Sequence, residues 1–167
     1  FSHPDPSVKR KTGFLTPVYG SSSENGSWVN IPYFKVIDEE KDLTFNPRVY
    51  ADDKFILQSE YRQAFENSNL ISDFSFNNDG KNSNTHLFAK IDGDINSTSK
   101  FNFKYQDVSN DDYLKIHNLS SSTSLIENES LLTTQLDIAK DIDENSNLET
   151  SFTVFEDLSK KDSDRFQ

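Results

Sequence analysis

The stretch "DLTFNPRVYADDKFILQSEYRQ", residues 42–63, alternates apolar and polar side chains in each of its two halves. The apolar positions are Leu43, Phe45, Pro47 and Val49 in the first half, and Phe55, Leu57 and Tyr61 in the second. A period of two is typical of a β-strand with one apolar and one polar face. Two aspartates stand between the halves, and aspartate favours turns. The stretch therefore predicts two antiparallel strands joined by a turn.

The same rhythm extends along the chain on both sides of this stretch. Further strands are expected at 13–19, 27–37, 70–77, 85–95, 100–106, 131–140 and 147–157. Polar connectors rich in Asn, Asp, Gly and Ser separate them, as turn chemistry requires. Residues 108–128 are Ser-rich and weakly patterned, so we expect a loop there, with a short strand around Tyr113–His117 and no helix. The predicted fold is an all-β antiparallel meander of about nine strands.

The composition requires the aromatic side chains to lie in a core or in lipid. A hydrophobic content of 33% and a net charge of −11 would by themselves favour disorder. The chain nevertheless contains 14 Phe, 6 Tyr and one Trp, which is too many for a disordered segment. No run approaches the roughly 18–20 apolar residues that a membrane helix needs. A helical membrane protein is therefore excluded, whereas a membrane β-barrel is not.

Motifs that would carry chemistry are weak. Asp141, Asp143 and Asn145 have calcium-loop spacing, but Ser146 and Phe152 stand where the glycine and the bidentate glutamate belong, so a polar hairpin turn is the better interpretation. The histidines are isolated, cysteine is absent and no nucleophile elbow surrounds a serine. We expect no enzyme activity, no cofactor and no metal. The acidic balance, with no basic patch among aromatics, also argues against a nucleic-acid partner.

The polar faces of the predicted strands carry charged and amide side chains at mid-strand positions. These are Arg48, Gln58, Glu60, Arg62, Lys90, Lys100 and Lys104. In an outer-membrane barrel such a face lines a wet lumen, whereas in a soluble sandwich it faces solvent. The pattern slightly favours the barrel, and the alternative is a secreted β-sandwich or a small complete barrel acting as a binding or structural module. Glu60 and Arg62 share one strand face, either as a surface ion pair or as a lumen charge pair.

Each arm of the hairpin expected over 13–34 contains a proline, Pro17 in the first arm and Pro32 in the second. Proline has no N–H and deletes a ladder hydrogen bond, so it is normally confined to edges, strand starts and bulges. The pair indicates a sheet margin with weakened pairing. In a soluble sandwich the same prolines would protect an exposed edge from aggregation.

The first twelve residues, "FSHPDPSVKRKT", differ from the rest of the chain. Pro4 and Pro6 stiffen the segment, and a basic cluster that includes Lys9 and Arg10 follows them. We expect residues 1–12 to be a connector from an upstream domain, and residues 13–167 to form the sheet.

Four stretches carry a family resemblance. They are "FSHPDP" at 1–6, "VKRKTGFLTPVYGSSSENGSWVNIPYF" at 8–34, "DLTFNPRVYADDKFILQSEYRQAF" at 42–65 and "DVSNDDYL" at 107–114. Together they resemble the LptD family, also called OstA, of outer-membrane lipopolysaccharide assembly proteins. The resemblance is densest over residues 1–65, and elsewhere it is a matter of strand pattern.

The resemblance implies a periplasmic jellyroll upstream, joined by a hinge at Pro4, Pro6, Lys9 and Arg10 to a very large transmembrane β-barrel, of which 13–167 would be the N-terminal part. It implies that Pro17 and Pro32 belong to a lateral gate through which lipopolysaccharide enters the outer leaflet. The polar side chains named above would face the lumen. The implied partners are lipopolysaccharide, a plug lipoprotein like LptE and a periplasmic bridge like LptA, and the implied location is the outer membrane of a Gram-negative bacterium.

Overall fold

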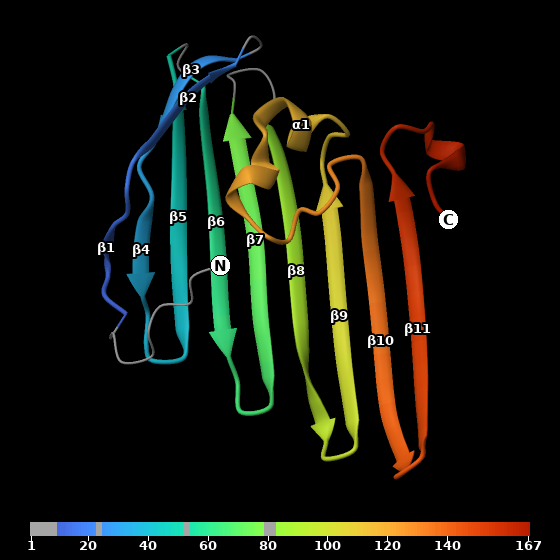
Figure 1. Ribbon diagram of the computed structural model, residues 1–167. Helices are drawn as coiled ribbons and strands as arrows, with labels where there is room; N and C mark the ends of the chain where they lie inside the picture. The colour runs from blue at the N-terminus through green and yellow to red at the C-terminus, as the bar shows by residue number, and fades with distance from the viewer. Residues whose placement is uncertain (1–9, 23–24, 52–53, 79–82) are drawn as a thin grey trace.

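A computed structural model describes residues 10–22, 25–51, 54–78 and 83–167. They form one antiparallel sheet of eleven strands, which is not closed into a barrel over the described residues (Figure 1). The strands are β1 (Gly13–Phe14), β2 (Val18–Ser22), β3 (Gly26–Asn30), β4 (Tyr33–Val36), β5 (Lys41–Tyr50), β6 (Phe55–Ala64), β7 (Ser68–Asn78), β8 (Ser83–Asn96), β9 (Ser99–Val108), β10 (Leu131–Asp143) and β11 (Ser146–Asp157). From β4 to β11 each strand pairs with the next along the chain. The predicted all-β antiparallel meander is confirmed.

Eleven strands correspond to nine passes of the chain, because each of the first two passes is interrupted. β1 pairs with β4 and β2 pairs with β3. Pro17 lies between β1 and β2, and Pro32 lies between β3 and β4. The prolines therefore stand in gaps between strands, whereas the sequence predicted continuous strands around them.

The segment 109–130 between β9 and β10 is where the secondary-structure prediction was wrong. Helix α1 (Tyr113–His117) replaces the expected short strand, and the 3₁₀-helix η1 (Leu119–Ser122) follows it. The buried members of α1 are Tyr113, Leu114 and His117, a spacing that places them on one side of a helix and not of a strand. Asn118 ends the helix in the left-handed conformation, at φ 47°. A second 3₁₀-helix, η2 (Asp162–Asp164), follows β11.

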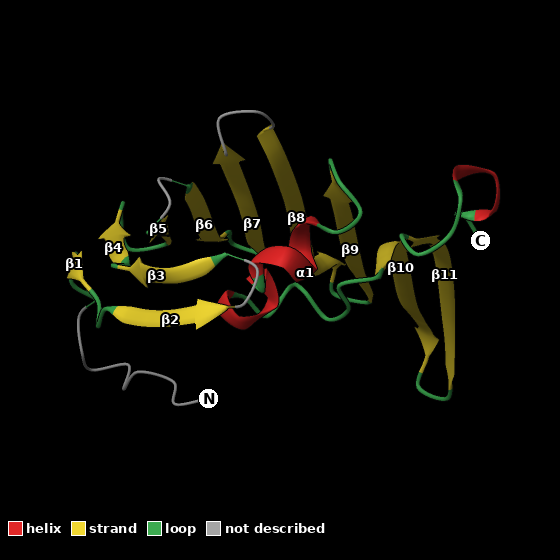
Figure 2. Cartoon of the chain, turned by 90° about the horizontal axis from the view of Figure 1, so that it is seen from above, coloured by secondary structure: helices red, strands yellow, loops and turns green. Residues whose placement is uncertain are grey.

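We call the face of the sheet on which α1 lies the inner face, and the opposite face the outer face. Figure 2 shows the segment 109–130 packed on the inner side of the central strands. The buried apolar cluster lies between this segment and the strands, and includes Tyr50, Ile56, Phe88, Tyr113, Leu114, Leu119, Leu125, Ile126 and Leu132. The core is thus local, since it lies under one segment.

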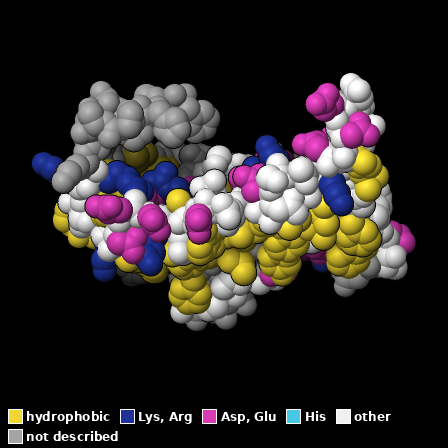
Figure 3. Space-filling view, turned by 90° about the horizontal axis from the view of Figure 1, so that it is seen from below, with side chains coloured by type: hydrophobic (Ala, Val, Ile, Leu, Met, Phe, Trp, Pro, Cys, Tyr) yellow, Lys and Arg dark blue, Asp and Glu magenta, His cyan; other side chains and the backbone are white. Residues whose placement is uncertain are grey.

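The outer face is apolar and exposed. Its exposed side chains, which occupy alternate positions of paired strands, include Val49, Phe55, Phe74, Phe76, Leu87, Phe103, Tyr105, Leu136, Ile138, Leu148 and Phe152. Figure 3, viewed from below, shows apolar side chains gathered along this side of the strands. Within the described ranges, no helix is long and apolar enough to cross a membrane.

Candidate functional site

All seven predicted polar-face residues lie on the inner face, where the strand registers connect several of them. Arg62 stands opposite Ile71, Ile71 opposite Lys90, and Lys90 opposite Lys104. Three cations from β6, β8 and β9 therefore occupy one row across the strands. Lys100 lies two rows further toward the turn between β8 and β9, opposite Asp94.

Each cation in this row has an acidic neighbour. Arg62 Nε donates to Asp42 Oδ1 at 2.8 Å, and Lys104 Nζ lies 2.9 Å from Glu127 Oε2. Lys90 Nζ lies 3.8 Å from Asp92 Oδ1. Charges of both signs thus alternate on the inner face, although the chain as a whole is acidic.

Two shallow hollows meet on the inner face at Ile71 and Asp92, and we call them together the inner groove. Its lining includes Arg10, Asp42, Arg62 and Asn69 at one end, and Lys90, Asn102, Lys104, Leu125, Glu127 and Gln135 at the other. Ammonium, guanidinium, amide and carboxylate groups supply both donors and acceptors. The inner groove therefore suits a ligand rich in hydroxyl and charged groups.

Beside the inner groove, Asp137 of β10 organises the polar side chains of three strands. It accepts hydrogen bonds from Ser151 Oγ at 2.6 Å, Asn102 Nδ2 at 3.0 Å and Gln135 Nε2 at 2.8 Å. These partners lie on β11, β9 and β10. A carboxylate with three donors is held in one orientation, so the polar surface here is preorganised.

Arg48 and Gln58 serve a different purpose, because they lie buried beneath the segment 109–130. Arg48 donates to the carbonyl of His117 and stacks over the ring of Trp28, with 4.5 Å from its Cζ to the ring centroid. Gln58 donates to Asp73 at 3.0 and 3.2 Å. The side chains of these two residues make contacts within the protein and do not line the inner groove.

A buried polar chain fastens α1 to the sheet. The Tyr113 hydroxyl lies 2.7 Å from Ser75 Oγ, which lies 2.6 Å from His86 Nδ1. His86 Nε2 in turn lies 2.5 Å from Asp73 Oδ1, and the side chains of His86 and Asp73 are both 0% exposed. Burial raises the pKa of Tyr113 to about 12. Although Ser, His and Asp converge here, Tyr113 covers the serine, so the cluster is an anchor.

His117 makes a second attachment of the same kind. Its Nδ1 lies 3.2 Å from the Tyr50 hydroxyl, and its Nε2 lies 3.2 Å from Asn77 Nδ2. Sequence reasoning treated His86 and His117 as isolated. The available signal was the inward alternation of Asp73, Ser75 and Asn77 along one strand, which predicts a polar cluster but not its partner.

The first hairpin has a break in its pairing at the prolines. Phe14 pairs with Tyr33 and Val18 pairs with Asn30, so residues 15–17 face only residues 31–32. Leu15 N donates to Pro32 O at 2.8 Å, and Val36 N donates to Thr12 Oγ1. In the second arm, the backbone N–H and C=O groups of even-numbered residues thus point toward the first arm. Proline at 32 removes a donor on that side.

A third proline, Pro47, stands at the same break from the other side, and sequence reasoning missed it. Pro47 lies opposite Ile31, because the pairs Asn30 with Arg48 and Tyr33 with Phe45 share one register. Tyr50 N donates to Lys54 O, whereas Ala51 N donates to Ser27 O. The backbone N–H and C=O groups of odd-numbered residues of β5 therefore point toward β3 and β4. At Pro47 the backbone N–H that would point toward the break is missing. The signal was its position, fifteen residues after Pro32.

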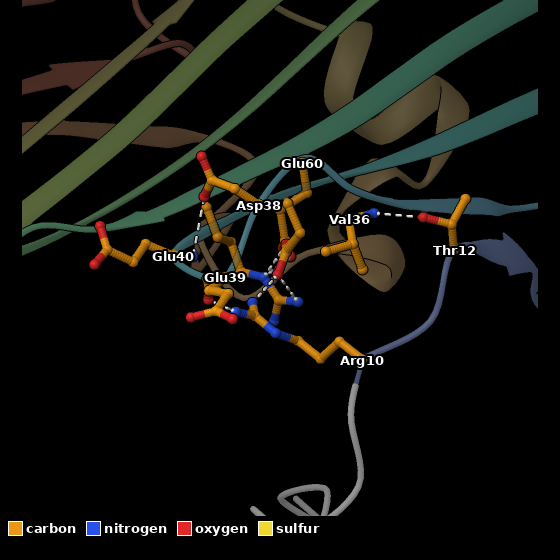
Figure 4. Close-up of polar contacts among 9 residues, drawn as sticks. Arg10, Thr12, Val36, Asp38, Glu39, Glu40 and Glu60 are labelled. Atoms are coloured by element: carbon orange, nitrogen blue, oxygen red, sulfur yellow. Dashed lines mark hydrogen bonds and ion pairs between the residues drawn. The ribbon is translucent and has the colours of Figure 1, made fainter.

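Of the predicted connector residues, Pro4, Pro6 and Lys9 lie outside the described residues, whereas Arg10 is described. Arg10 reaches the turn that precedes β5, where it donates to the Glu39 carbonyl (Figure 4). The stretch with calcium-like spacing is the turn between β10 and β11, as predicted, and Asn145 N donates there to Asp143 Oδ1 at 2.9 Å. Among the residues that the structure describes, no three potential ligands converge on a metal site.

Fold and site together define an all-β protein whose single sheet has a polar inner face and an exposed apolar outer face. No family model matches the chain. The chain is 38% identical over 63 residues to LPS-assembly protein LptD of Ralstonia nicotianae, covering 38% of this chain and 8% of that protein. The chain is 33% identical over 117 residues to the protein of that name from Shewanella frigidimarina, and the match covers 64% of this chain and 15% of that protein. It is 27% identical over 119 residues to the protein of that name from Thiobacillus denitrificans, and the match covers 70% of this chain and 16% of that protein.

The similarity to LptD proteins is therefore distant and partial. The chain spans less than a fifth of the length of these curated relatives, since the matches cover 8%, 15% and 16% of them.

Proposed function

We propose that this chain is one wall of an outer-membrane barrel that assembles lipopolysaccharide at the cell surface without enzyme chemistry. The observation that carries the proposal is the exposed apolar outer face, which runs opposite a polar inner face across successive strands. The distant similarity to LptD proteins supports the cargo.

In this proposal the outer face contacts lipid and the inner face lines an aqueous lumen. A tilted transmembrane strand needs about 9–11 residues. Strands β5 to β9 have 10, 10, 11, 14 and 10 residues, and β10 and β11 have 13 and 12. They are long enough to span a bilayer, and the inner groove would accept the sugars and charged groups of the cargo.

The interrupted first hairpin would form a lateral gate. Pro17 and Pro32 separate β1 from β2 and β3 from β4, and Pro47 removes a further donor at the same level. The net contribution of one hydrogen bond to stability is about 1 kcal/mol in water, and a backbone group left without its hydrogen bond costs more in lipid. A margin that already lacks several of them opens at lower cost.

The remaining partners follow from the same proposal. Residues 1–12, with Pro4, Pro6, Lys9 and Arg10, would connect the barrel to an upstream periplasmic domain that receives lipopolysaccharide from an LptA-like bridge. An LptE-like lipoprotein would occupy the lumen. Arg62, Lys90, Lys100 and Lys104 would contact the cargo, whereas Glu60 lies beside Arg62, at 3.8 Å from its Nε.

The test is to restore backbone donors in the full-length protein with the double variant Pro17→Thr and Pro32→Thr. Tighter pairing should lower the lipopolysaccharide exposed at the cell surface several-fold and raise sensitivity to large antibiotics. Thr16→Val is the matched control, because it changes a neighbouring residue without adding a donor. Normal export by a double variant that reaches the membrane in normal amount would overturn the gate.

A further inference from the structure

The chain just before β1 is fastened to the hairpin formed by β4, β5 and the turn between them. Arg10 Nη1 lies 2.5 Å from Asp42 Oδ2, and the same guanidinium donates to the Glu39 carbonyl. Two residues later, Thr12 Oγ1 accepts a hydrogen bond from Val36 N at 3.0 Å. Figure 4 shows Arg10 beside Glu39 and Thr12 beside Val36, so the two attachments lie at the same end of the sheet.

Asp42 is the centre of this attachment. Its side chain is 1% exposed, and it receives Arg62 as well as Arg10, with Arg62 donating at 2.8 and 3.2 Å. A buried carboxylate is strongly unfavourable unless it is paired and hydrogen-bonded. Arg10 therefore supplies one of the two cations that this carboxylate needs, which distinguishes the contact from an ordinary surface ion pair.

The rest of the first pass is weakly held. β1 has only two residues, paired with Phe34 and Tyr33, and β2 pairs with β3 alone. Between them lies the break at Pro17 and Pro32. The contacts of Arg10 and Thr12 thus act below the break, on the side of the turn between β4 and β5.

We propose that Asp42, through Arg10, holds the N-terminal end of the first strand in place. The first hairpin then opens at the proline break, while its end beside the turn between β4 and β5 stays closed. This inference rests on the proposed gate for its purpose, but the anchor itself is a property of the isolated protein. Arg10 and Asp42 are then positioning residues, which fix where the movement begins.

Hydrogen exchange of the full-length protein in detergent, without lipopolysaccharide, tests the anchor. In Arg10→Gln, peptides that contain Leu15 and Val36 should exchange about fivefold faster, the effect of losing roughly 1 kcal/mol of local stability. Peptides from β7 to β9 should not change. Lys11→Gln is the matched control, because it removes one positive charge from the adjacent exposed residue.

Two further variants keep the test decisive. Arg10→Lys keeps the charge but cannot reach both Asp42 and the Glu39 carbonyl with one planar group, so it should give an intermediate rate. Asp42→Asn should accelerate the same peptides while β7 to β9 stay protected. Unchanged exchange in Arg10→Gln, or equal acceleration in Lys11→Gln, would overturn the anchor. If the anchor variants behave as expected while the proline double variant exports normally, the gate fails and the anchor stands.

Discussion

Tyr113 shows how a single hydroxyl fixes a whole segment on the sheet. Four residues form the buried hydrogen-bonded series Tyr113, Ser75, His86 and Asp73. Tyr113 comes from the segment 109–130, and the other three come from β7 and β8. A buried polar cluster specifies one arrangement when all its members are satisfied. Sequence alternation placed Asp73, Ser75 and His86 at polar positions of their strands but predicted no contact among them, and their partner came from a helix that the alternation did not predict.

The ionisation of Tyr113 gives a pH prediction. An unfolded tyrosine ionises near pH 10, whereas the pKa of Tyr113 is raised to about 12. Stability from this group is therefore fully present below pH 10 and is lost as the pH rises toward 12, by roughly 2–3 kcal/mol in total. Proteolysis within 109–130 should increase over this window.

A spectrophotometric titration provides the measurement. The absorbance of ionised tyrosine should show one component near pH 12, which Tyr113→Phe should remove. The same variant should loosen the segment by about 1 kcal/mol at neutral pH through the lost hydrogen bond to Ser75. A variant with an unchanged late component would show that Tyr113 does not carry it.

At the level of elements, the strands were predictable and their interruptions were not. Alternation located β5 to β11 because each strand has one apolar and one polar face. Pro17 and Pro32 were predicted to lie within two strands, but the register shift at residues 15–17 leaves them between strands. Sequence cannot show such a shift, because it depends on how two arms align.

Pro47 offers the sharpest test of the break as a structural element. Pro47→Thr should restore a donor toward Ile31 and add about 1 kcal/mol to the pairing of β5 with β3 and β4. Hydrogen exchange of residues 28–36 should slow, whereas exchange in β10 and β11 should not change. Faster exchange of 28–36 would mean that the donor finds no acceptor there.

For the whole molecule, the two faces of the sheet are the main result. Sequence predicted which residues share the inner face, and the registers place Arg62, Lys90 and Lys104 in one row. It did not predict that Arg48 and Gln58 would be covered, because the segment 109–130 carries little pattern of its own. The exposed apolar outer face is the property that the proposed membrane role requires.

The most direct measurement compares two adjacent residues of β9 in the full-length protein in cells. A photoreactive benzoylphenylalanine placed at Phe103 lies on the outer face, and one placed at Asn102 lies on the inner face. The account predicts phospholipid adducts at Phe103 and none at Asn102. Equal lipid labelling at both positions, or none at Phe103 in protein that is correctly folded, would contradict it.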